Sequence, residues 1–192
     1  MTDGFQPGGR SPAPPPLDLV QDFVNTEIPD WDRDDIATPE AFGAWLAARG
    51  LLREGTTVDG ETVTGAHALR AAIRDLALAN TLGERPGVAR AREIDEALAR
   101  FPLAVRLVDG VPALVPPGAA AEAALGTVVA IVAEARLRGV WERVKACRQE
   151  TCGWVFYDGS RNRSSSWCSM RVCGGRAKAS SYRRRHAAGT AR

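Results

Sequence analysis

The stretch that organises the chain extends from Cys147 to Arg185: CRQETCGWVFYDGSRNRSSSWCSMRVCGGRAKASSYRRR. It holds all four cysteines of the chain, in two equally spaced pairs, Cys147-x4-Cys152 and Cys168-x4-Cys173. Two close pairs on either side of a short insert can fold back to surround one tetrahedral ion. Four thiolates favour zinc, and an iron–sulfur cluster is the alternative that spacing alone leaves open.

Two disulfides are the other chemistry open to four cysteines. The chain begins MTDGFQPGGRSPAPPP, which lacks the charged-then-apolar pattern of a secretion signal. We therefore expect a cytoplasmic protein in a reducing compartment, where structural disulfides are rare. No segment reaches the roughly eighteen apolar residues that a membrane span needs, so we expect no membrane partner.

The residues around the cysteines predict a small treble-clef-like module. Trp154–Tyr157 has strand character, Asp158-Gly159 is a turn signal, and a second short strand is expected just before Trp167. The polar segment from Arg176 to His186 predicts a helix after the last cysteine. Because the segment is too short to bury an adequate core, we expect the metal to supply much of its folding free energy, about 10 kcal/mol or more.

From Phe156 onward, FYDGSRNRSSSWCSMRVCGGRAKASSYRRR resembles the CGNR-type zinc finger. The segments LDLVQDFVNT, FGAWLAARGL and ALRAAIRDL resemble the ABATE domain that accompanies this finger. The resemblance implies a stress-linked transcription regulator whose finger binds DNA. Two positions depart from the family pattern: Gly175 replaces the name-giving Asn, and Ser164-Ser165-Ser166 stands where relatives often carry more Arg. Gly can serve at a helix start or at a left-handed position, whereas fewer arginines weaken a DNA contact.

Charge is distributed unevenly along the chain. Residues 141–192 hold 12 Lys+Arg and 3 Asp+Glu, whereas residues 1–140 hold 13 basic and 20 acidic residues. The C-terminal part is therefore at +9 and the rest at −7, and four thiolates on a divalent ion would leave the C-terminal part near +7. Such asymmetry predicts a polyanionic partner at one end of the molecule.

We expect that partner to be nucleic acid, with duplex DNA as the expected form, because arginines neutralise phosphates and a helix can reach base edges in a groove. The alternative is a zinc-stapled protein-interaction or small-molecule-sensing module that binds no nucleic acid. The candidate contacts are the basic side chains around and after the metal: Arg161, Arg163, Arg171, Arg176, Lys178, Arg183, Arg184 and Arg185.

The remainder of the chain predicts a mainly α fold with three parts. Residues 1–16 are rich in Gly and Pro and are expected to form a disordered or extended tail, residues 17–140 an ABATE-like helical domain, and residues 141–192 the finger with its basic segment. Within the helical domain, apolar periodicity and capping residues predict helices over 17–26, 38–50, 66–82, 88–101 and 118–138, and a β-hairpin over 103–115.

Two of these elements carry further expectations. The helix over 118–138 is apolar on most faces and should be central, and the hairpin around Asp109-Gly110 should pack on helices because two strands alone are marginal. An acidic stretch follows the first helix and predicts either a solvated loop anchored by Trp31 or a polar, cation-binding surface; its members are Glu27, Asp30, Asp32, Asp34 and Asp35.

Catalysis is not predicted. The chain has no phosphate-binding loop, dinucleotide fingerprint, HExxH or GxSxG, and a four-sulfur metal site leaves no open position for a substrate. We therefore expect a regulator that is not an enzyme. Its N-terminal domain would sense a small-molecule effector or form a homodimer.

Overall fold

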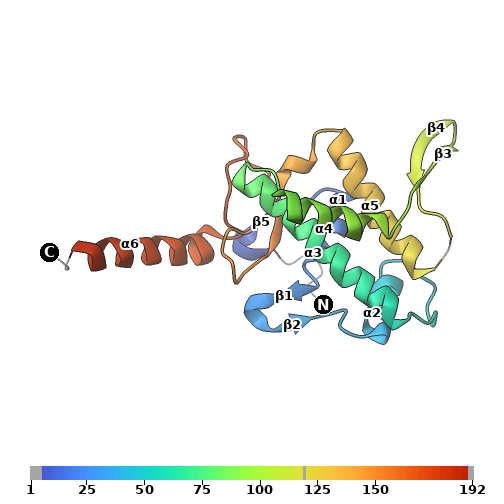
Figure 1. Ribbon diagram of the computed structural model, residues 1–192, viewed down its shortest axis with the longest axis horizontal. Helices are drawn as coiled ribbons and strands as arrows, with labels where there is room; N and C mark the ends of the chain where they lie inside the picture. Colours follow the sequence, from blue (N-terminus) through green and yellow to red (C-terminus); the bar gives the residue numbers. More distant parts are fainter. Residues whose placement is uncertain (1–5, 119, 190–192) are drawn as a thin grey trace.

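The computed structural model describes residues 6–118 and 120–189, which form a mainly helical body and one long helix that projects from it (Figure 1). This confirms the predicted mainly α class. No helix in the described ranges is both long enough and apolar enough to cross a membrane. The elements in chain order are η1 (Pro7–Gly9), α1 (Leu17–Val24), β1 (Glu27–Ile28), η2 (Pro29–Trp31), β2 (Arg33–Asp34), α2 (Pro39–Ala47), α3 (Gly60–Leu82), α4 (Val88–Ala99), β3 (Ala104–Val108), β4 (Val111–Val115), α5 (Ala121–Leu137), η3 (Trp141–Arg143), β5 (Val144–Ala146), β6 (Val155–Tyr157), η4 (Met170–Gly174) and α6 (Gly175–Gly189).

The main hydrophobic core lies where α1, α3 and α5 meet. Phe23 of α1 is fully buried and lies edge-on to Trp45 of α2, with 5.9 Å between the ring centroids. From α5, Leu125, Val128 and Val132 are each at most 3 % exposed. A helix that is apolar on most faces must be enclosed on most faces, so α5 passes through the core as its sequence predicts.

The longest helix, α3, begins earlier than the sequence predicts. The helix was predicted over 66–82, but it starts at Gly60, where the Asp59 side chain accepts a hydrogen bond from Thr62 N at 2.7 Å. This is an N-cap, which satisfies one free N–H of the first turn. At the other end Gly83 adopts φ +69°, the left-handed position that ends many helices.

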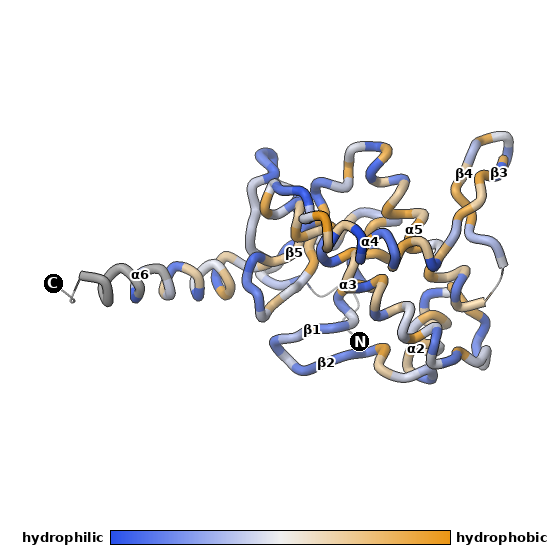
Figure 2. The backbone as a smooth tube through the Cα atoms, viewed as in Figure 1, coloured by the Kyte–Doolittle hydropathy of each residue, from blue (hydrophilic) through white to orange (hydrophobic). Residues whose placement is uncertain are grey.

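The β3–β4 hairpin forms in the predicted register, with Val108 opposite Val111. Asp109 and Gly110 have φ of +49° and +78°, as a tight two-residue turn requires. Its packing differs from the prediction: every residue of β3 is exposed, and only the end of β4 approaches α5. The hairpin therefore projects from the body (Figure 1), and several of its strand residues are hydrophobic (Figure 2).

The N-terminal segment also differs from the expected disordered or extended tail. Residues 6–16 lie against the body, and Gln6 and Ala13 are only 7 % and 3 % exposed. Gln6 Oε1 accepts a hydrogen bond from Trp154 Nε1 at 3.3 Å, which joins this segment to the metal module. Composition could not foretell this packing, because the partner is almost the whole chain away. Residues 1–5 of the predicted tail lie outside the described residues.

Candidate metal centre and basic helix

The first cysteine pair lies in the turn of a small antiparallel hairpin formed by β5 and β6. Pairing extends from Val144, opposite Tyr157, to the hydrogen bond from Cys147 N to Trp154 O at 2.8 Å. A second bond, from Cys152 N to the carbonyl of Gln149 at 2.9 Å, closes the turn. Both thiols are therefore carried on one tight knuckle.

The strand that pairs with β6 is a correction to the prediction. It was expected just before Trp167, but the described residues there form no strand, and β5 precedes Cys147 instead. β5 is only three residues long, Val144–Ala146, and all three are buried. Such a segment is too short to show the alternation by which a strand is recognised in sequence.

The second pair is held by the π-helical turn η4, which is wider than an α-helical turn and continues directly into α6. Ser169 caps the turn: its Oγ accepts from Val172 N at 3.3 Å and its carbonyl from Gly174 N at 3.0 Å. Cys168 precedes the turn and Cys173 lies within it. Gly175, which replaces the family Asn, has φ −64° and ψ −45°, so this position needs no left-handed residue. A cysteine knuckle in the turn of the β5–β6 hairpin, followed by a second cysteine pair at the start of a helix, confirms the treble-clef-like module.

The four sulfur atoms converge on one point. All four Sγ atoms lie within 4.8 Å of one another, and Cys168 Sγ is 3.6 Å from both Cys152 Sγ and Cys173 Sγ. A tetrahedral zinc ion with Zn–S bonds of about 2.3 Å separates its sulfurs by about 3.8 Å, so the spacing fits a single ion. A disulfide is much shorter, and an iron–sulfur cluster needs room for several atoms between the thiolates. The donor set and its spacing support Zn²⁺.

Protons compete with the metal at this cluster. Hydrogen bonds with Cys147 and Cys152, together with burial, raise the pKa of the Cys168 thiol. The hydrogen bond with Cys147 likewise raises the pKa of Cys152 to about 12. Crowded thiols resist losing all their protons unless a cation compensates the charge. Zinc binding must therefore release protons and weaken as the pH falls.

A buried ion pair shapes the loop between the two cysteine pairs. Asp158 is fully buried and Lys145 is 4 % exposed, with 3.2 Å between Lys145 Nζ and a carboxylate oxygen. The carboxylate also accepts from Ser160 N at 3.0 Å and from Ser165 N and Oγ at 2.9 Å each. Although burial opposes it, these hydrogen bonds from Ser160 and Ser165 hold the pKa of Asp158 below its usual range. The sequence marked Asp158 only as part of a turn.

Arg10 braces the second knuckle from the N-terminal segment. Its guanidinium donates to the carbonyls of Cys168 and Trp167 at 2.9 Å each. The same group lies over the ring of Phe156, 4.4 Å from the ring centroid. A planar cation suits this site because it can stack on an aromatic ring while its edge donates hydrogen bonds. Sequence reasoning missed Arg10 because it treated residues 1–16 as a tail.

Side-chain amides and a hydroxyl attach the finger to the helical body. Asn25 binds both backbone groups of Val155, accepting from its N–H and donating to its carbonyl at 2.8 Å each. Thr81 donates to the carbonyl of Ala146 at 2.7 Å, and Asn80 donates to two carbonyls just before it at 2.9 Å each. Val144, Ala146 and Val155 of the β5–β6 hairpin belong to the same core as α1, α3 and α5, whereas Phe156 packs in a separate cluster with the cysteines. One face of the hairpin is thus part of the core of the body.

The predicted basic contacts lie on three parts of the finger. Arg161 and Arg163 are on the loop after β6, Arg171 is on η4, and the others are on α6. All those whose side chains are described are exposed, and Arg176 pairs with Asp30 at 2.9 Å. The side chains of Arg184 and Arg185 lie outside the described part of the chain.

The acidic stretch after α1 is an ion-pair network instead of an open cation site. The Asp34 carboxylate accepts a hydrogen bond from each terminal nitrogen of Arg70 at 2.7 Å. Arg74 donates a hydrogen bond to Glu27 at 2.5 Å. Burial opposes ionisation of Asp34, but the hydrogen bonds from Arg70 hold its pKa below the ordinary value. Trp31 is 58 % exposed, so it does not anchor the loop as expected. Other pairs in this stretch are Arg33–Asp35, Arg70–Glu27, His67–Asp34 and Arg176–Asp30.

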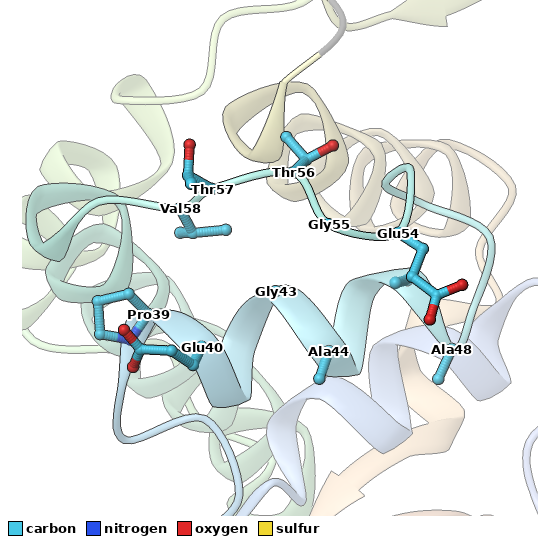
Figure 3. A pocket seen from close by; sticks show the side chains of 11 residues that line it. Pro39, Glu40, Gly43, Ala44, Ala48, Glu54, Gly55, Thr56, Thr57 and Val58 are labelled. Atoms are coloured by element: carbon cyan, nitrogen blue, oxygen red, sulfur yellow. The ribbon is translucent and has the colours of Figure 1, made fainter.

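A cavity of about 600 Å³ lies between α2 and residues 54–58, and no residue of the finger lines it (Figure 3). Gly43 and Ala44 form part of its floor, and the carboxylates of Glu40 and Glu54 lie at its two ends (Figure 3). Its lining contains no thiol and no imidazole. We assign it no part in the functional site.

Four buried thiols on two knuckles, followed by a basic helix, define a treble-clef-like zinc finger joined to a helical domain. The chain belongs to the ABATE family, described as "Putative stress-induced transcription regulator", which matches residues 17–142. Residues 143–186 match the CGNR zinc finger. No curated protein matches the chain. The resemblance inferred from the sequence is confirmed, and the two matches support a zinc-binding regulator.

Proposed function

We propose that the protein is a DNA-binding transcription regulator whose finger holds one zinc ion and contacts duplex DNA. The observation that carries the proposal is α6: it projects from the body and has five basic and no acidic residues (Figure 1). A helix that is polar on all faces gains little from packing on a protein core. A polyanion is the partner that such a helix fits.

Electrostatics supports DNA as that partner. The finger is near +7 once the thiolates and zinc are counted, whereas residues 1–140 are at −7 and would repel phosphates. The helical body must therefore face away from DNA while the finger approaches it. Charge of this kind strengthens binding to any sequence and speeds association.

Helix geometry suggests how α6 meets the duplex. Arg176 and Arg183 are seven residues apart, which places them on the same face two turns along the helix. The major groove of DNA is wide enough to admit a helix, and arginine can bind guanine edges there in a bidentate manner. In this proposal Arg183 and the basic residues of the finger loop contact phosphates, and Arg176 or Lys178 lies closer to the bases.

The metal has a structural role in this proposal. Cys147, Cys152, Cys168 and Cys173 are its ligands, and a closed four-thiolate shell holds zinc without catalysing a reaction. Because η4 carries Cys173 and continues into α6, the ion fixes the direction in which the helix leaves the finger. Metal loss should therefore weaken DNA binding even where every basic residue is present.

The helical body has the sensing or dimerising role in this proposal, and the regulator acts in the cytoplasm. The exposed β3–β4 hairpin supports a homodimer, because apolar side chains such as Val105 and Leu107 are 74 % and 73 % exposed. An unpaired strand edge with apolar side chains is a surface on which a second copy can pair.

Duplex binding at several salt concentrations tests the proposal. If four to six cations contact phosphates, the logarithm of the affinity should fall with the logarithm of salt at a slope of about −4 to −5. The α6 variant Arg183→Gln removes one phosphate contact and should flatten that slope by about one. The control Arg106→Gln removes an exposed charge from the hairpin and should leave the slope unchanged. Fluorescence anisotropy of a labelled duplex with zinc-loaded protein measures the salt slope of the unchanged protein, of the α6 variant and of the control.

The opposite result would favour the other function. If zinc-loaded protein at micromolar concentration does not associate with duplex DNA at low salt, α6 is not a DNA-binding helix. The finger would then be an interaction module for another protein. Equal salt slopes for the α6 variant and for Arg106→Gln would likewise contradict the assigned contacts.

A further inference from the structure

A cavity of about 810 Å³ lies where the N-terminal segment, the β1–β2 region and the second cysteine knuckle meet. It is separate from the cavity beside α2 and opens next to the metal centre. Its volume falls within the range of pockets that hold small organic ligands, roughly 300–1,000 Å³. Its walls come from three segments that are far apart in the sequence, and the principal side chains are Ile28, Trp31, Trp154, Met170, Val172 and Arg176.

The walls expose more apolar surface than the fold requires. Trp31 is 58 % exposed, Met170 57 % and Val172 46 %, although each lines the same cavity. Single exposed apolar side chains are common, but three large ones from two distant segments around one hollow mark a binding surface. A tryptophan face and a thioether both favour an aromatic ring, by stacking and by sulfur–aromatic contact.

The backbone on the N-terminal side leaves room for a flat molecule. Gly8 and Gly9 line the cavity and have φ of +73° and +70°, a conformation that favours glycine. A side chain on Gly8 would approach Ser169 Oγ to 3.0 Å, so this wall is close to the knuckle. The cavity is therefore bounded on one side by bare backbone and on the other by apolar side chains.

The charges at the rim of the cavity are balanced, and this balance favours a ligand without a net charge. Arg176 is paired with Asp30 at 2.9 Å, so the two side chains together add little net charge to the rim. Arg171 makes no ion pair within the described residues, but the cavity also borders thiols that become a net negative centre on binding zinc. An anion would approach that centre, and a cation would approach the two arginines. A charged ligand of either sign would therefore bind with a less favourable free energy than an uncharged one.

We propose that this cavity binds a small, uncharged, flat aromatic molecule, with its ring between Trp31 and the Met170–Val172 side of the knuckle. The site is distinct from the zinc ion and from the proposed DNA contacts, although Arg176 borders both. Its test contains no DNA, so failure of this site would leave the proposed DNA binding untouched, and the reverse also holds.

Three naphthalene derivatives that differ in charge test the proposal on zinc-loaded full-length protein. They are 2-naphthol, which is neutral at pH 7, 2-naphthoate and 2-naphthylmethylamine. The indole N–H signal of Trp31, assigned by its loss in Trp31→Phe, should shift on titration with 2-naphthol. We expect 2-naphthol to bind at least tenfold more tightly than either charged compound.

Variants separate this site from general adsorption. Trp31→Ala should weaken 2-naphthol binding about tenfold, the effect of removing one aromatic wall. Val172→Phe should block the cavity by filling it, and its zinc content and melting temperature show whether the finger still folds. The control Val105→Ala changes an equally exposed apolar residue on the hairpin and should leave binding unchanged. Binding that is unaffected by both Trp31→Ala and Val172→Phe, no shift up to millimolar 2-naphthol, or equal affinity for a charged analogue would overturn the proposal.

Discussion

Replacing Asp158 by Asn should destabilise the finger by about 3–5 kcal/mol, although the side chain keeps its shape. The carboxylate is fully buried and accepts three hydrogen bonds while facing the Lys145 ammonium at 3.2 Å. The amide turns one acceptor into a donor that faces a backbone N–H of Ser160 or Ser165, which costs about 1–3 kcal/mol. Lys145 also loses its only carboxylate partner among the described residues, and breaking a buried pair typically costs about 3–5 kcal/mol.

Urea unfolding at pH 7 and a fixed excess of zinc measures this effect, and zinc release to a coloured chelator reports on the metal centre separately. The loop that Asp158 organises leads to Cys168, so the variant should also release zinc faster. The control is Glu134→Gln, the same chemical change in an exposed pair with Arg138, which should cost less than about 0.5 kcal/mol. A double-mutant cycle with Lys145→Met should show coupling of at least about 1 kcal/mol. An Asp158→Asn cost below about 0.5 kcal/mol, with no coupling, would refute the reasoning.

Three further predictions concern the metal, the junction and the core. Cys168→Ser should lower bound zinc from about one equivalent to near zero by elemental analysis; full retention of zinc would contradict the four-thiol site. Asn25→Ala leaves both backbone groups of Val155 without partners and should cost about 2–5 kcal/mol in urea unfolding, and a change under about 0.5 kcal/mol would show that the junction is loose. Val132→Asp buries an unpaired charge in α5 and should abolish cooperative melting, whereas Leu137→Asp, at an 82 % exposed position, should melt normally; similar melting of the two variants would show that α5 is not central.

The parts of the molecule that sequence predicts well are those whose information is local. The cysteine pairs define the metal site because each pair fits within one knuckle and four thiols have few other uses in such an arrangement. The turn at Asp109-Gly110 is local in the same sense, and so is the start of the helix predicted over 38–50, where the Thr38 hydroxyl accepts a hydrogen bond from Ala41 N. Helix α5 follows from its own composition, since a segment apolar on most faces has to be enclosed.

The parts that sequence misses depend on partners far away in the chain. Arg10 lies in a Gly- and Pro-rich segment, and its structural role depends on the carbonyl of Cys168, which only the folded chain brings beside it. Asp158 was interpreted as a turn residue because nothing local shows that Lys145 is buried opposite it. The sequence could not decide between the two interpretations of the acidic stretch for a similar reason. Arg70 lies 36 residues beyond Asp34, and only folding brings its guanidinium against the carboxylate.

The shared core beneath the β5–β6 hairpin bears on how this finger can be inherited or engineered. Many small metal-binding fingers are exchanged between proteins as cassettes, because each folds around its own ion. Here Val144 and Val155 are buried with the helices of the body, and Asn25 holds the outer strand from more than a hundred residues away. A graft cut at residue 141 would carry the thiols but leave behind the surface on which the hairpin rests. The transplantable unit extends from residue 6 onward, because Gln6 and Arg10 also contact the finger, so substitutions in the finger and in the helical domain act on the stability of one folding unit.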